Sequence, residues 1–211
     1  MLAPRAERPG PRRPDPGRAP TSPSLRPARD RLASCRDDAA LPTPRYHQCV
    51  YADGFSFLEE ERDAWRPFEA LLELTDEQLE RSVEGAHGWS GRDLMAHLSV
   101  WIEWMLSVTR ELALGPDSPT YERFRAITND WEAQGDLLNA RYQMEWAVLP
   151  MTEVRHRFST MPGELRGYLT VVPETRWLKD PDLLRSLLGN TTEHYTEHEV
   201  DLRAVLSAAG R

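Results

Sequence analysis

The chain has 211 residues, with 26 basic against 34 acidic side chains and a formal net charge of −8. This length fits one ordered domain. The acidic balance argues against nucleic acid as a partner, because phosphate binding needs a basic face. No stretch is long and apolar enough to span a membrane, so a membrane partner is not expected either.

Residues 1–45 differ in composition from the rest of the chain. They hold 10 of the 17 prolines and 10 arginines against 5 acids, which leaves a net charge of −13 for the remaining residues. Such a stretch cannot bury enough apolar surface to offset its ordering entropy, so a disordered tail is predicted. A second interpretation stays open, in which translation starts downstream and this tail is upstream sequence read in frame.

The only two cysteines, Cys35 and Cys49, lie in or beside this tail. They show no metal-ligand spacing and offer no disulfide framework, which favours a cytoplasmic location.

Helical periodicity begins after Gly54, and Pro67 is expected to kink or divide this first helix. Thr75 and Gln78 form a capping-box pattern for a short helix over residues 76–81. Ser90 and Asp93 predict the start of a longer helix, which Gly115 and the following proline end near residue 114. The buried stripe of this longer helix reads Leu94, His97, Leu98, Trp101, Met105, Val108 and Leu112.

Residues 116–127 give no clear signal. A helix is predicted over residues 129–148, and Thr152 is expected to cap the next one, which runs to residue 172 and is interrupted at Pro162. After a loop over residues 173–181, the last helix is predicted over residues 182–206. No segment alternates with period two, so the fold class is all-α.

His194 and His198 lie four residues apart in that last helix, so their side chains project from one face. Their stripe also carries leucines and a valine, and His97 lies on the apolar stripe of its own helix, so all three are expected to point inward. Buried imidazoles are costly unless their nitrogens are paired, and one shared divalent cation would pair all three. The alternative, open from spacing alone, is that each is a core histidine with a protein partner.

Two motifs resemble a known family. Gly88-Trp89-Ser90-x-Arg92-Asp93-Leu94-x-Ala96-His97-Leu98, followed by Trp101, resembles the second helix of the DinB-like superfamily, and Asn190-Thr191-x-Glu193-His194-Tyr195-x-Glu197-His198 resembles its last helix. The resemblance spans residues 55–207. It implies an up-down-down-up four-helix bundle whose nickel or zinc ligands fall on His97, His194 and His198.

The resemblance also implies a chemistry. Three histidines leave a fourth metal position open, which is typical of a reactive site. Relatives resemble S-transferases that use a low-molecular-weight thiol such as mycothiol or bacillithiol. They include mycothiol-dependent maleylpyruvate isomerase, whose pattern has a carboxylate in place of one histidine. The expected activity is attack by a metal-held thiolate on a small electrophilic substrate, and homodimers are expected because relatives often pair.

Three further residues each have two interpretations, and one of the two places the residue at this site. Trp101 either walls the pocket or belongs to the core, and the core is favoured for Trp104. Arg92 either binds a carboxylate of the cofactor or is solvated in the first helical turn. Asp201 either orients a histidine ligand or is an exposed acid paired with a base such as Arg203.

Two other functions stay open. The protein is then a non-catalytic metal-binding or stress-linked binding protein, or a hydrolase that uses metal-bound water. No acid in the sequence is identifiable as the general base that hydrolysis needs, which favours the transferase among the enzymes.

Overall fold

The computed structural model describes residues 51–211, so the predicted tail and both cysteines lie outside the described residues. The described chain is all-helical, which confirms the all-α class, and it contains no strand within residues 51–211. Its elements are α2 (Gly54–Trp65), η1 (Arg66–Glu73), α3 (Asp76–Leu79), η2 (Glu84–Ala86), α4 (Gly91–Leu114), α5 (Pro119–Thr128), α6 (Trp131–Ala147), α7 (Met151–Val171), η3 (Glu174–Arg176), α8 (Pro181–Asn190) and α9 (Thr192–Ala208).

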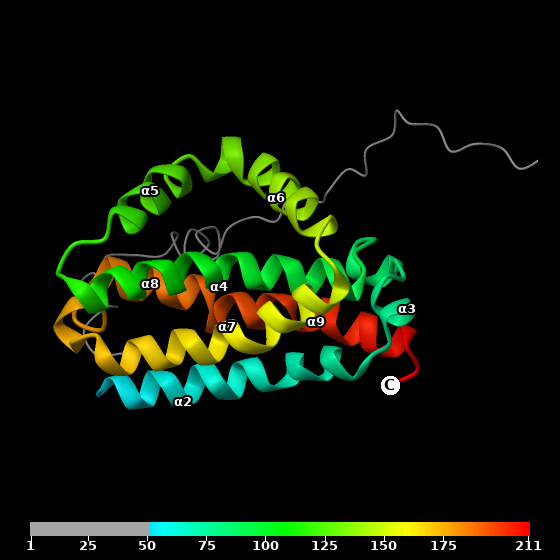
Figure 1. Ribbon diagram of the computed structural model, residues 1–211, viewed down its shortest axis with the longest axis horizontal. Coiled ribbons are helices and arrows are strands. Elements are labelled where there is room, and N and C mark those ends of the chain that lie inside the picture. The colour runs from blue at the N-terminus through cyan, green and yellow to red at the C-terminus, as the bar shows by residue number, and fades with distance from the viewer. Residues whose placement is uncertain (1–50) are drawn as a thin grey trace, which may run out of the picture.

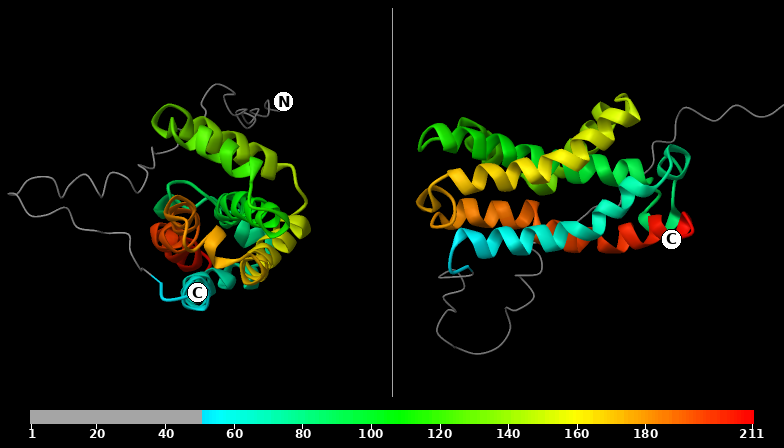
Figure 2. Two further views of the ribbon diagram at one scale, coloured as in Figure 1. Left: turned by 90° about the vertical axis from the view of Figure 1, so that its left-hand side faces the viewer. Right: turned by 60° about the horizontal axis from the view of Figure 1, so that its bottom comes forward.

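The long helices form one packed body, and two further helices lie outside it. Helices α2, α4, α7 and the α8–α9 pair run along the long axis of the molecule (Figure 1). Helix α4 contacts α5, α6, α7, α8 and α9, so it is the central element. Helices α5 and α6 lie outside this body as a layer over one side of α4 (Figure 2).

Local sequence signals fix the start of α4. Ser90 and Asp93 form the predicted capping box, with the Asp93 amide donating to Ser90 Oγ and the Ser90 amide to Asp93 Oδ2. Gly91 follows because a Cβ there would lie 2.7 Å from the Leu79 side chain and 3.2 Å from that of Val205. The close approach brings the first turns of α4 against α9, where the histidines lie.

The predicted breaks in the chain were partly right. Pro67 divides the first helix into α2 and the 3-10 helix η1, and Thr75 caps α3 as expected. Residues 116–127, which gave no clear signal, contain most of α5, whose N-cap is Ser118. Helix α7 begins after Pro150 rather than at a Thr152 cap, because the fixed φ of Pro150 suits the residue that precedes a first helical turn.

The interruption predicted at Pro162 is wrong. Helix α7 continues through this residue, which is buried between Phe158 and Leu165 on the side that faces the core. The helix loses one backbone hydrogen bond at the proline, but packing on both sides keeps its two halves in line.

The single last helix that the sequence predicted is also wrong. It divides into α8 and α9 at Thr191, whose backbone leaves helical geometry at φ −128° and ψ −103°. The Thr191 hydroxyl donates to the Leu187 carbonyl at 2.6 Å, and the side-chain Nδ2 of Asn190 donates to the Ser186 carbonyl at 2.6 Å. Side chains that satisfy the last carbonyls of α8 compete with helix continuation, and α9 therefore starts two residues before His194.

No helix within residues 51–211 has the length and apolar character needed to cross a membrane.

Candidate metal centre

Three histidines from two helices meet in the packed interior. His97 comes from α4, and His194 and His198 come from the first two turns of α9. Their ring centroids lie 4.8–4.9 Å apart in every pairing, and all three side chains are buried. The i, i+4 spacing thus places two imidazoles side by side on α9, and the inward face of α4 supplies the third.

The nitrogens of these rings converge. One ring nitrogen from each histidine lies within 4.8 Å of the others, and His97 Nε2 is 2.9 Å from His194 Nε2. Two nitrogens bound to one ion at about 2.0–2.1 Å with tetrahedral angles would be about 3.3 Å apart. The spacing of this pair therefore fits a shared cation after an adjustment of a few tenths of an ångström.

Burial keeps these imidazoles in the form that binds metals. Loss of solvent lowers the pKa of both His97 and His194 well below the usual 6.5, and the neighbouring histidines lower it further. Both rings are therefore neutral at pH 7, with a lone pair on each. His194 Nδ1 is buried without a hydrogen-bond partner among the described residues, so the protein alone does not satisfy this cluster.

Asp201 orients the third histidine. Its Oδ2 atom lies 2.8 Å from His198 Nδ1, and both side chains are buried. A carboxylate accepts, so Nδ1 is the donor of this hydrogen bond, and Nε2 is the nitrogen of His198 left to bind an ion. The other interpretation, an exposed acid paired with a base such as Arg203, is wrong, because Asp201 is buried and Arg203 is paired with Glu199.

His87 reaches the edge of this arrangement. Its side chain is 55% exposed, with Nε2 3.9 Å from Asp201 Oδ1. His156, Glu193 and Glu197 are exposed.

Tryptophans surround the histidines. The Trp101 ring lies 6.3 Å from that of His97 and 6.4 Å from that of His194. Trp89, which the sequence indicated only as the start of a motif, stacks on His198 at 5.6 Å and lies 4.8 Å from His97. Trp89 lies one residue before the Ser90 cap and therefore outside the helix. Periodicity could not predict its contacts with the two histidines.

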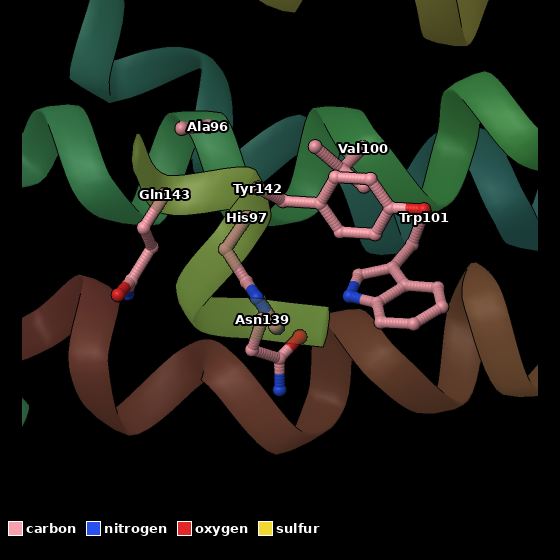
Figure 3. A pocket seen from close by; sticks show the side chains of 7 residues that line it. All are labelled: Ala96, His97, Val100, Trp101, Asn139, Tyr142 and Gln143. Carbon is pink, nitrogen blue, oxygen red and sulfur yellow. The ribbon is translucent and has the colours of Figure 1, made fainter. Parts of the chain in front are cut away.

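A narrow recess opens beside His97. Figure 3 shows the side chains from α4 and α6 that line it. Trp101 lines this recess, as one of its two predicted roles requires. Trp104 does not; it packs against the core and donates from Nε1 to the Tyr142 hydroxyl at 2.9 Å. The lining residues are Ala96, His97, Val100, Trp101, Asn139, Tyr142 and Gln143.

Arg92 has a place that neither sequence interpretation anticipated. It is absent from the lining of the recess, and its side chain is only 17% exposed. Its guanidinium donates to the backbone carbonyls of Trp146, Ala147 and Leu149. The solvated interpretation is therefore wrong, and Arg92 instead ties the end of α6 to the start of α4.

Comparison with protein families agrees with this geometry. Residues 61–203 match the family described as the mycothiol maleylpyruvate isomerase N-terminal domain. The chain belongs to this family. The family is part of the DinB-like superfamily and is metal-binding, so the resemblance in the sequence motifs is confirmed. Comparisons with curated proteins and with solved structures gave no match.

The matched range of the isomerase N-terminal domain family contains the three histidines and Asp201. It also contains α6, which carries the outer wall of the recess.

Proposed function

We propose that this protein is a metal-dependent S-transferase that uses a low-molecular-weight thiol in detoxification or a stress response. His97, His194 and His198 would hold the divalent cation. The observation that carries the proposal is the convergence of three buried imidazoles next to a recess. Family membership supports the choice of thiol, since the family description names mycothiol.

The donor set favours a reactive site over a closed structural one. No fourth metal-binding side chain joins the three histidines within residues 51–211. Structural zinc sites use four protein ligands, whereas reactive sites keep one position open. The bound cation would supply a Lewis acid that lowers the pKa of a thiol and favours its thiolate form.

The surrounding residues would prepare this site for the reaction. Asp201 would hold His198 in the tautomer that binds the cation, and Trp89 and Trp101 would exclude water from the reacting sulfur. The thiolate sulfur would form a bond to an electrophilic carbon of the second substrate, and the leaving group on that carbon would depart with its bonding electron pair, as chloride does from monochlorobimane.

Several finer features belong to the same proposal. The metal is zinc or nickel, and the thiol is mycothiol or bacillithiol. Helices α2, α4, α7 and α8–α9 would form the up-down-down-up four-helix bundle of the superfamily, with α5 and α6 added to it. The protein would act in the cytoplasm as a homodimer on a small-molecule substrate.

Of the two alternatives, the hydrolase fits the site less well, and the non-catalytic protein fits it equally. A hydrolase needs a general base near metal-bound water, but no carboxylate lines the recess and Asp201 is engaged by His198. A non-catalytic metal-binding protein shares the same histidines and is separated from the enzyme only by assay.

The test is conjugation of monochlorobimane, a fluorogenic electrophile, to mycothiol and to bacillithiol by metal-loaded protein. We expect a rate above background with at least one thiol, and none with metal-free protein or with the His198→Ala variant. Background rates with both thiols would contradict the transferase. In that case, a large loss of thermal stability on chelation would identify a structural metal, because metal that binds only the folded state stabilises it.

A further inference from the structure

A second cavity lies between α4 and α6, next to the recess beside His97. It is a cleft of about 220 Å³. Val100 and Tyr142, both labelled in Figure 3, line the recess and the cleft alike. The volume of the cleft corresponds to about seven water molecules, so it has room for a small organic molecule but not for a drug-sized one.

Aromatic side chains form much of the cleft wall. Trp104 comes from α4, and Tyr142 and Trp146 come from α6. Trp104 Nε1 donates to the Tyr142 hydroxyl at 2.9 Å, so the rings of the two helices hold one another in place. The face of an aromatic ring carries partial negative charge and attracts cations, most strongly in tryptophan. The guanidinium of Arg157 lies 5.5 Å from the centre of the Trp146 ring, so the protein itself already places a cation beside this wall.

The charged residues that line the cleft are both acidic. Glu103 on α4 and Glu145 on α6 supply one carboxylate to each wall, and their side chains are 47% and 50% exposed. Arg141 lies 2.8 Å from Glu145, while Arg157 approaches Glu103 only to 4.0 Å and is paired more closely with Glu153 at 2.7 Å. Neither arginine lines the cleft, and ion pairs as exposed as these are weak. Both carboxylates are therefore available to a cation in the cleft.

We infer that this cleft binds a small organic ammonium ion, whose alkyl groups contact the three aromatic rings and whose charge faces Glu103 and Glu145. Both carboxylates would repel an anion, and a neutral ligand would gain no charge attraction from them. A metal ion would need more ligands, since the cleft holds no group of three metal-binding side chains within residues 51–211. The inference goes beyond the proposed function, because it does not depend on an ion at the histidines.

Choline and 3,3-dimethylbutanol test this inference on metal-loaded full-length protein. The two alcohols have nearly the same shape, but the positively charged nitrogen of choline is replaced by a neutral carbon in the second. Binding of each is followed through saturation transfer from the protein to its methyl protons, and a titration gives the dissociation constant. We expect choline to bind about tenfold more tightly, the value of a cation contact with rings and carboxylates in a partly exposed cleft.

Variants then assign this preference to the cleft. Glu103→Gln/Glu145→Gln should reduce the ratio of the two dissociation constants to about three or less, because only the aromatic contacts remain. Glu122→Gln/Glu132→Gln changes the net charge by the same amount at two exposed positions outside the cleft, and it should keep the tenfold ratio.

Competition between salts tests the part played by the rings. Tetramethylammonium chloride should displace choline, whereas sodium chloride at the same concentration should displace much less of it. The sodium ion is strongly hydrated and gains little from the aromatic wall, so its effect is limited to screening.

Equal dissociation constants for choline and its neutral analogue, or a preference that survives Glu103→Gln/Glu145→Gln, would overturn the cation site. Choline binding that does not saturate, or displacement by sodium as complete as that by tetramethylammonium, would do the same. The proposed transferase stands or falls separately, through the conjugation assay.

Discussion

Helix α9 contributes neighbouring residues to two different buried polar clusters, Tyr195 to one and His194 to the other. Tyr195 belongs to a glutamate cluster with Glu61 and Arg166, in which Glu61 accepts from the Tyr195 hydroxyl at 2.9 Å and from Arg166 Nη1 at 2.6 Å. The histidine cluster consists of His97, His194 and His198. Both oxygens of Glu61 are paired, whereas His97 Nε2 and His194 Nε2 face one another and His194 Nδ1 is unpaired.

This difference shows in which cluster the protein's own side chains satisfy the buried polar groups. The glutamate cluster contains its own cation in Arg166, and it therefore links α2, α7 and α9 without a ligand. The histidine cluster brings three electron-pair donors together without a positive charge between them. Its arrangement is explained if the missing charge is a metal ion.

Removing the cation of the glutamate cluster should have the largest effect on stability. In Arg166→Met the carboxylate of Glu61, which is fully buried, loses its counter-ion. We expect the free energy of unfolding to fall by about 3 kcal/mol, with metal content unchanged. Urea denaturation measures the loss, and Arg203→Met at an exposed ion pair serves as the control, expected to change stability by less than about 0.5 kcal/mol. Equal losses in both variants would show that the glutamate cluster is not special.

Asp201→Asn should weaken metal binding by the histidine cluster without abolishing it. The variant keeps the shape of the side chain but loses the charge that orients His198. We expect metal affinity to fall about 10- to 100-fold, measured by competition with a chromogenic chelator. Glu193→Gln, an exposed position on the same helix, should retain wild-type affinity. Wild-type affinity in Asp201→Asn would remove Asp201 from the site.

The two clusters should respond to pH in opposite directions in metal-free protein. Burial lowers the pKa of His97 and His194, so as pH falls through their usual 6.5 the unfolded chain takes up protons that the folded chain does not, and stability falls. Burial raises the pKa of Glu61 above its usual 4.5, although Arg166 and Tyr195 offset part of this. The folded chain therefore holds a proton that the unfolded chain has lost, and stability falls as pH rises from 4.5 through that raised pKa.

Each histidine can contribute at most about 1.4 kcal/mol per pH unit. Urea denaturation between pH 5 and 8 checks both signs. In the double variant His97→Leu/His194→Leu, the free energy of unfolding should fall less as the pH decreases. Arg166→Met should lose more stability at pH 8 than at pH 5. If the double variant loses as much stability at low pH as the wild type, this loss comes from other groups.

The sequence predicted those features that depend on neighbours along the chain. The Ser90–Asp93 and Thr75–Gln78 capping boxes, the division at Pro67 and the inward face of His97 all follow from local chemistry or periodicity, and all are confirmed. The break at Thr191 was missed because its hydroxyl competes with the backbone only once tertiary packing buries it.

Residues that act through distant partners were not predictable in the same way. Arg92 looked like a solvated first-turn residue because its carbonyl acceptors lie 54 to 57 positions away. Glu61 and Arg166 lie 105 positions apart, and each resembles an ordinary surface residue of an amphipathic helix.

Elemental analysis of purified protein tests the histidine cluster most directly. We expect about one divalent metal ion per chain in the wild type, loss of that ion in His198→Ala, and full retention in His156→Ala, which removes an exposed histidine of α7. Wild-type protein without stoichiometric metal, or full retention in His198→Ala, would contradict the three-histidine site.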